Sequence, residues 1–124
     1  MNKKSTDSKL EESLKKLEAA LKNEKLLFDD DVYFAGVIKY FEVALEYAWK
    51  FMKHEVNKQG FEAYSPRESI KLAGQIKLID DVEKWLDFLE DRNLSVHDYL
   101  GVPETEYLEL IRDFVLHAKR LVRR

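Results

Sequence analysis

The side chains best suited to chemistry lie in one ten-residue segment, residues 90–99, with the sequence EDRNLSVHDY. Arg92 is a permanent cation that can grip a phosphate through two parallel hydrogen bonds. His97 titrates near neutral pH, so it can move a proton to or from a ribose hydroxyl or a leaving oxygen. Together they form a minimal set for metal-free RNA cleavage, in which the 2′-hydroxyl attacks its own phosphate. The hydroxyl of Tyr99 could itself receive a nucleotide.

A structural explanation of the same three residues remains open. Arg92 could pair with a neighbouring acidic residue, His97 could be a helix-end cation, and Tyr99 could belong to the core. Five residues on a helix also rotate the side chain by about 140°. Arg92 and His97 can therefore meet only if the helix breaks or bends near Ser95, or if a second subunit supplies one of them.

Other constellations of catalytic or metal-binding residues are missing. The sequence has no Gly-rich phosphate loop and no cysteine, and its histidines are too far apart for a metal-type spacing. We therefore expect no metal and no cofactor. The acidic triplet Asp29, Asp30 and Asp31 is suited to capping a helix, with a cation site as the alternative.

The apolar pattern predicts long helices. Leucines at 10, 14, 17 and 21 form one stripe of a helix over about 6–28. A second helix over about 32–58 is apolar on two sides, which is typical of a central helix or of one that faces a second subunit. Gly60 is expected to end it. Further helices are expected from Ser65-Pro66-Arg67-Glu68, from Asp80 with Glu83, and over about 104–122 after Gly101 and Pro103.

These elements predict an all-α fold, an up-down bundle of four to five helices in a single domain over 1–124. Residues 1–8 are expected to be a flexible N-terminal tail. No apolar run is long enough to cross a membrane, and the N-terminus does not resemble a signal peptide, so we expect a cytoplasmic location.

The net charge of −3 does not favour general nucleic-acid binding, so any RNA contact needs a local basic patch. The basic C-terminus, Lys119, Arg120, Arg123 and Arg124, is such a patch or simply favours the end of a helix. Trp49, Trp85 and the tyrosines are expected in the core or in a dimer interface rather than as base-stacking platforms.

The arrangement Arg92-x4-His97-x-Tyr99, near the end of a helix, resembles the signature of HEPN proteins (higher eukaryotes and prokaryotes nucleotide-binding). The surrounding sequence resembles the branch called nucleotidyltransferase substrate-binding proteins. The similarity rests on residues 65–68, 85–87 and 89–94, and on the segment FEVALEYAWK at 41–50. It extends over about 10–122.

The resemblance implies a HEPN-like helical bundle that forms a homodimer and pairs with a separately encoded minimal nucleotidyltransferase. In toxin–antitoxin members the HEPN subunit is a metal-independent ribonuclease, and the paired enzyme silences it by adding AMP to the motif tyrosine. Carried over, Arg92 and His97 would be catalytic and Tyr99 the modified residue. Asn93 matches the polar position that follows the arginine and would have a supporting role.

Three functions follow as hypotheses. The first is an endoribonuclease toxin, the second is a non-catalytic subunit that presents nucleotide or substrate to the nucleotidyltransferase, and the third is a helical scaffold without nucleotide chemistry. The intact residues Arg92, His97 and Tyr99 favour the first over the third. The sequence does not separate the first from the second.

Overall fold

The structure, a computed structural model, describes the backbone of residues 2–98 and 104–122 and the side chains of residues 8–90 and 105–122. Within these ranges the regular elements are six α-helices. Their bounds are α1 Asn2–Leu21, α2 Glu24–Asp29, α3 Asp31–Lys58, α4 Pro66–Gln75, α5 Val82–Asp98 and α6 Glu104–Val122. The expected all-α class is therefore confirmed.

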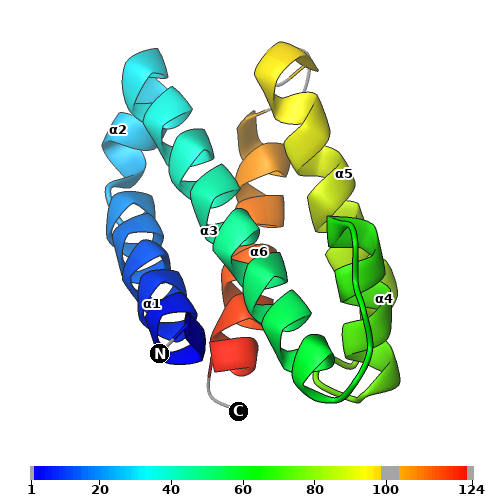
Figure 1. Ribbon diagram of the computed structural model, residues 1–124. Helices are drawn as coiled ribbons and strands as arrows, with labels where there is room; N and C mark the ends of the chain where they lie inside the picture. Colours follow the sequence, from blue (N-terminus) through cyan, green and yellow to red (C-terminus); the bar gives the residue numbers. More distant parts are fainter. Residues whose placement is uncertain (1, 99–103, 123–124) are drawn as a thin grey trace.

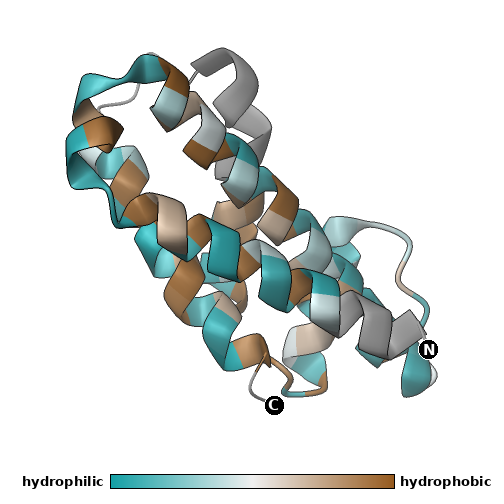
Figure 2. Ribbon diagram, turned by 90° about the vertical axis from the view of Figure 1, so that its left-hand side faces the viewer, coloured by the Kyte–Doolittle hydropathy of each residue, from teal (hydrophilic) through white to brown (hydrophobic). Residues whose placement is uncertain are grey.

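The four long helices α1, α3, α5 and α6 run alternately up and down the bundle (Figure 1). Helix α3 stands at the centre, with α1 and α2 on one side, α4 and α5 on the other, and α6 behind it. Hydrophobic and hydrophilic residues alternate along the helices (Figure 2), as expected when each helix buries one face.

The N-terminal part differs from the sequence prediction in two ways. Helix α1 begins at Asn2, whereas the first helix was predicted to begin at about Thr6. The helix predicted over 6–28 is divided into α1 and α2, because Asn23 caps a new helix by accepting a hydrogen bond from the Leu26 N–H at 3.2 Å. The leucine stripe ends at Leu21, and the buried position on α2 is Leu27, which is out of phase with that stripe. The break explains why the described part of the chain has six helices rather than four or five.

Two predicted helix starts are confirmed, and one is shifted by a residue. Asp30 caps α3 by accepting hydrogen bonds from the N–H groups of the two residues at 32 and 33, at 2.9 and 3.1 Å. Ser65 caps α4 by accepting from the Glu68 N–H at 3.1 Å. Helix α5 is capped by Asp81, which accepts from the Lys84 N–H at 3.0 Å, whereas the sequence analysis placed this cap at Asp80.

The end of α3 also follows the prediction. Gly60 has a φ of 92°, the left-handed conformation that glycine adopts without steric cost. The Phe61 N–H donates to the Val56 carbonyl at 3.1 Å, and the Gly60 N–H donates to the Asn57 carbonyl at 3.0 Å. This pair of bonds is the Schellman motif, which satisfies carbonyls at the helix end.

The doubly apolar pattern of α3 results from its central position. On its second stripe Val37, Ala44 and Phe51 are buried within the chain. Tyr33 on the same stripe donates its hydroxyl hydrogen bond to the Ala20 carbonyl of α1 at 2.7 Å. Of the two explanations for this pattern, the central position accounts for these residues, whereas Tyr40 on the same stripe is 42% exposed.

Replacing glycine by alanine is expected to have opposite effects on stability in α4 and in α3. A Cβ added at Gly74 would collide with the side chain of Val82, because α4 approaches the start of α5 there. A Cβ at Gly36, in α3, meets nothing within 4 Å. We expect Gly74→Ala to lower the free energy of unfolding by about 1–3 kcal/mol, and Gly36→Ala to raise it by about 0.5–1 kcal/mol.

Urea unfolding of the two variants beside the wild type measures both effects. Adding Val82→Ala to Gly74→Ala should recover part of the loss, because it removes the atoms in collision. A Gly74→Ala protein that is as stable as the Gly36→Ala protein would contradict this packing of α4 on α5.

Candidate functional site

The motif residues lie at the end of α5, and the structure describes them only in part. The backbone of α5 includes positions 92, 93 and 97, the predicted Arg92, Asn93 and His97. Their side chains lie outside the described residues, and so does Tyr99 as a whole. The last described side chain before the motif is the exposed Glu90.

Helix α5 continues without interruption to Asp98, past the positions of Arg92 and His97. It includes position 95, near which a break or bend was one way to bring Arg92 and His97 together. On an uninterrupted helix, positions 92 and 97 are about 140° apart around the axis. Of the two geometries left open by the sequence, the backbone therefore favours the one in which a second subunit supplies one of the two residues.

A cluster of edge-to-face aromatic contacts fixes the first half of α5 to α6. Trp85 and Phe88 are 1% exposed. Both pack against Phe114 of α6, with ring centroids 5.8 and 5.6 Å away. Phe114 in turn contacts Phe41 of α3 at 5.1 Å. The predicted core position of Trp85 is confirmed, and the cluster holds the helix that bears the motif against α3 and α6.

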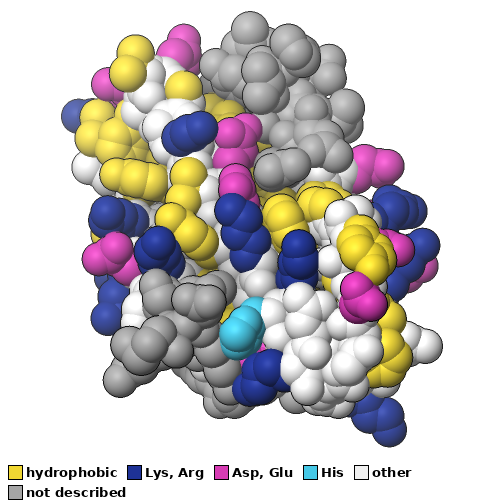
Figure 3. Space-filling model, in the orientation of Figure 1, with side chains coloured by type: hydrophobic (Ala, Val, Ile, Leu, Met, Phe, Trp, Pro, Cys, Tyr) yellow, Lys and Arg dark blue, Asp and Glu magenta, His cyan; other side chains and the backbone are white. Residues whose placement is uncertain are grey.

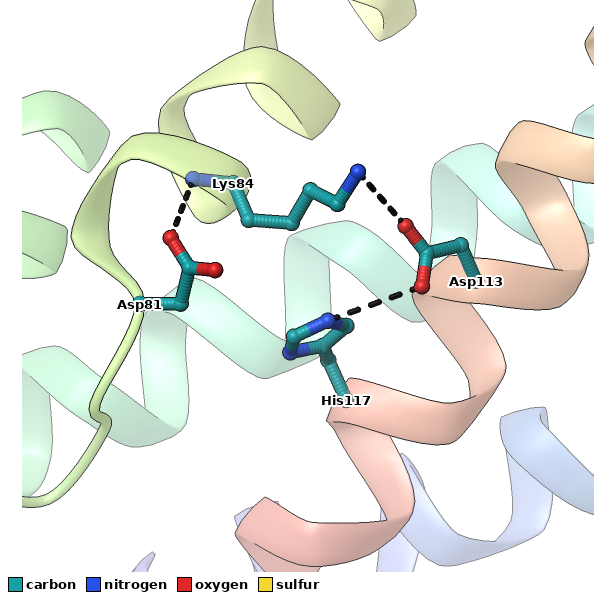
Figure 4. A network of polar contacts seen from close by, with 4 residues as sticks. All are labelled: Asp81, Lys84, Asp113 and His117. Atoms are coloured by element: carbon teal, nitrogen blue, oxygen red, sulfur yellow. Dashed lines mark hydrogen bonds and ion pairs between the residues drawn. The ribbon is translucent and has the colours of Figure 1, made fainter.

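A polar network links α5 and α6 beside this cluster (Figure 4). The Lys84 ammonium lies 2.8 Å from one carboxylate oxygen of Asp113, and His117 Nε2 lies 3.6 Å from the other. Asp81, which caps α5, accepts from the Lys84 backbone. The His117 ring also contacts Phe88, with centroids 5.6 Å apart. Asp113 is thus held between two basic groups, one from each helix.

The network has a structural role, because it joins α5 to α6 through charged groups. The hydrogen bond and the charge of Asp113 raise the pKa of Lys84 above its ordinary value, so Lys84 stays cationic. The side chain of His117 is 12% exposed and faces aromatic rings. It therefore has little access to a substrate. Sequence reasoning did not find this cluster; its one local signal is the Asp113-x3-His117 spacing, which places both residues on one helical face.

A groove of about 610 Å³ lies between α5 and α6. Its floor includes Phe88 and Leu110, and its rim carries Lys84 and Arg112 together with four acidic residues, Asp87, Glu90, Glu109 and Asp113. Glu90 and Glu109 mark the end of the groove next to the motif. Because acidic groups outnumber basic ones, the groove does not favour an RNA backbone.

The basic groups described elsewhere are interspersed with acidic and hydrophobic ones. On the face over α1, α3 and α4, Lys and Arg alternate with Asp, Glu and hydrophobic side chains (Figure 3). Lys119, one of the candidate RNA contacts, lies 2.8 Å from Glu18 of α1. This pair gives Lys119 a structural role in joining α6 to α1. Arg123 and Arg124 lie outside the described residues.

The described residues contain neither a cluster suited to a metal ion nor a membrane-spanning helix. Among them, no group of three His, Asp or Glu residues could hold a metal ion. None of the helices, as far as they are described, is both long and apolar enough to span a membrane.

Comparisons with known proteins identify the family and the fold. Residues 7–124 match the model of the family described as "Nucleotidyltransferase substrate binding protein like". The curated protein named "Probable ribonuclease HepT", from Haemophilus influenzae, is 28% identical over 97 residues, covering 74% of this chain. The match spans 66% of the length of that relative.

Solved structures show the same fold. The tri-AMPylated Shewanella oneidensis HEPN toxin, in complex with MNT antitoxin, aligns with a TM-score of 0.83 at 16% identity, over 98% of this chain and 93% of that chain. A mutant of the toxin–antitoxin pair MntA–HpeT aligns with a TM-score of 0.82, also at 16% identity, over 98% and 94%. A Thermus thermophilus protein is 27% identical, with a TM-score of 0.74 over 93% and 99%.

The Lys84–Asp113 pair predicts a specific pH dependence of stability. The pKa of Lys84 is raised in the folded state, so the pair stabilises fully below the ordinary lysine value of about 10.4. This stabilisation is lost as the pH rises through the folded pKa. We expect Lys84→Met to lower the thermal midpoint slightly and equally at pH 7 and 9, and the difference from wild type to shrink by pH 11.

Lys71→Met, at an exposed position of α4, is the matched control and should show no such pattern. If the thermal midpoints of Lys84→Met and wild type differ by the same amount at pH 11 as at pH 7, the stabilising role of the Lys84–Asp113 pair is contradicted.

Proposed function

The chain belongs to the family of nucleotidyltransferase substrate-binding-like proteins, and we propose that it is the partner subunit of a minimal nucleotidyltransferase and a metal-independent endoribonuclease toxin. The observation that carries the proposal is the Arg92-x4-His97-x-Tyr99 motif at the end of α5, inside the matched residues 7–124. A relative named as a ribonuclease and a structural neighbour described as a HEPN toxin with an MNT antitoxin support it.

The proposed reaction uses only groups of the chain and the RNA. Arg92 binds the scissile phosphate and stabilises the negative charge that grows on it. His97 transfers a proton as general acid or base. The 2′-oxygen loses its proton and forms a bond to phosphorus, while the bond from phosphorus to the 5′-oxygen breaks and that oxygen gains a proton. The products are a 2′,3′-cyclic phosphate and a free 5′-hydroxyl, and no redox step or metal is needed.

The proposed active form contains two copies of the chain. Because α5 is uninterrupted through position 95, Arg92 of one copy and His97 of the other are the pair that can converge on one phosphate. A two-fold axis at the motif end of α5 would create two such sites from the same surfaces. The proposed homodimer rests on this argument, since most of the apolar positions of α3 are buried within the chain.

Tyr99 is the proposed point of control. Its hydroxyl oxygen would attack the α-phosphorus of ATP, the bond to pyrophosphate would break, and the hydroxyl proton would pass to solvent or a base. The AMP would place a phosphate near Arg92 or its counterpart in the second copy. It would occupy the place of the RNA phosphate, and its charge would repel the substrate backbone.

The family description also supports a second candidate. A protein described as substrate-binding could present nucleotide or substrate to the nucleotidyltransferase without cutting RNA. This alternative predicts binding without cleavage and no dependence on the proton-transfer chemistry of His97.

The first test is RNA cleavage in the presence of EDTA, analysed on denaturing gels. Activity should persist with the chelator, and Arg92→Ala and His97→Ala should each lower the rate by about a hundredfold or more without loss of helicity. Arg67→Ala and His54→Ala change the same residue types on α4 and α3 and should leave the rate unchanged. Cleavage that requires added Mg²⁺, or full activity of His97→Ala, would overturn the mechanism.

The second test concerns modification. With ATP and the cognate nucleotidyltransferase, intact-mass spectrometry should show the wild type gaining the mass of one AMP or more, with loss of RNA cleavage. Tyr99→Phe should gain none and remain active, because the acceptor oxygen is missing. Tyr64→Phe, at a tyrosine that is 76% exposed, is the control and should be modified like the wild type. Equal labelling of Tyr99→Phe and wild type would remove Tyr99 from the site, and no labelling of either would favour the binding subunit.

A further inference from the structure

The motif position 92 continues the buried side of α5. Trp85 and Phe88 are both 1% exposed, and position 92 follows them by seven and four residues on the same uninterrupted helix. These spacings place position 92 within about 40° of both residues around the helix axis. The side of α5 that packs on α6 therefore extends into the motif, where its next residue is Arg92.

The motif position 97 lies on the other side of α5. It is nine residues after Phe88, which corresponds to a rotation of about 180°. It is also seven residues after Glu90 and fourteen after Glu83, so it lies within about 40° of both. These two glutamates are exposed. The register of α5 thus gives the arginine position to the buried side and the histidine position to the exposed side.

Phe88, one helical turn before position 92, is held by three rings. The ring centroids of Trp85, Phe114 and His117 each lie 5.6 Å from that of Phe88. Trp85 belongs to α5, and the other two belong to α6. Because a protein interior is close-packed, Phe88 cannot shift without displacing these rings. The buried side of α5 is therefore fixed up to the turn that precedes the arginine.

His117 is a nearly buried titratable residue that the proposed RNA chemistry does not use. Its side chain is 12% exposed, and its Nε2 lies 3.6 Å from a carboxylate oxygen of Asp113. The other oxygen of Asp113 lies 2.8 Å from the Lys84 ammonium (Figure 4). The network thus holds the imidazole in place from α6, with its ring against Phe88.

We propose that Phe88 is a positioning residue for Arg92, and that His117 acts through Phe88. Residues four apart on a helix are neighbours, and long helical side chains lean toward the residue four positions earlier. The ring of Phe88 therefore sets where a guanidinium group at position 92 meets the phosphate. His97 gains nothing from this support. The proposal rests on the proposed ribonuclease function, and it makes the arginine half of each site the half that the core of the chain fixes.

RNA cleavage in EDTA gives the first test. Phe88→Leu should lower the rate about tenfold or more, because a small misplacement of a group that stabilises the transition state is costly. Phe51→Leu is the matched control, since it shortens another buried phenylalanine in the second half of α3, and it should leave the rate unchanged. Circular dichroism verifies that both variants are folded at the assay temperature. Equal rates of Phe88→Leu and wild type overturn the proposal.

Two substitutions at one position test the part of His117. His117→Ala removes the ring that supports Phe88 and should lower the rate in the same direction as Phe88→Leu. His117→Phe keeps a ring against Phe88 but has no group that can pair with Asp113, and it should regain most of the wild-type rate. A His117→Phe protein as slow as His117→Ala overturns the action of His117 through Phe88.

Mixed assemblies distinguish positioning of the arginine from a general loss of structure. In a co-refolded mixture of Arg92→Ala and His97→Ala copies, the His97→Ala copy supplies the arginine of the shared site. Adding Phe88→Leu to that copy should lower the activity of the mixture about tenfold or more. Adding it to the Arg92→Ala copy, which supplies only the histidine, should leave the activity within about twofold of the reference mixture, because position 97 lies on the opposite side of α5.

The outcomes separate this inference from the proposed function. Equal losses in the two mixtures, or a loss only when the histidine-supplying copy carries Phe88→Leu, overturn the positioning role of Phe88 and leave the ribonuclease function standing. An inactive reference mixture, without any change at Phe88, overturns the shared site itself and the inference with it.

Discussion

The burial of Trp85 and Phe88 against Phe114 is the interaction on which the rest of the structure depends. These edge-to-face contacts join α5 to α6, and Phe114 continues them to Phe41 at the centre of α3. Each ring removes a large apolar area from water, which supplies most of the stabilisation here. The Lys84–Asp113–His117 network lies at the border of this cluster and helps to orient α5 against α6. It adds little to the free energy of unfolding, because partly exposed ion pairs contribute little to stability.

This anchoring constrains the function because the motif is on the same helix. Helix α5 is fixed through its first half, and its last turns extend the same regular geometry to Asp98. A helix that is held in this way keeps positions 92 and 97 on different sides. The chemistry proposed for Arg92 and His97 therefore requires an assembly in which a second copy supplies one of the two residues.

Local chemistry explains what the sequence could predict. The spacing of apolar residues predicted the helices. The capping residues Asp30 and Ser65 predicted where α3 and α4 begin, because capping hydrogen bonds join residues two to four positions apart. Gly60 was predictable for the same reason. The break at Asn23 was missed because strong helix formers continue on both sides of it. The shift from Asp80 to Asp81 reflects two adjacent acids with equal capping ability.

Tertiary features could not be predicted from local sequence patterns. The polar network joins residues about thirty positions apart, and nothing in the sequence around Lys84 indicates Asp113 as its partner. The two apolar sides of α3 had two explanations, and only the packing of the other helices around α3 distinguishes them. The candidate site was found through residue types and resemblance, whereas its dependence on a second copy follows from the uninterrupted course of α5.

The most direct measurement mixes two inactive proteins. Arg92→Ala and His97→Ala are co-refolded in equal amounts, and RNA cleavage is measured in EDTA. If each site takes its arginine from one copy and its histidine from the other, half of the random dimers are mixed and each has one intact site. The account therefore predicts recovery of about a quarter of wild-type activity. If the wild type cleaves and exchange of subunits is verified by mass, a mixture as inactive as its components would contradict it.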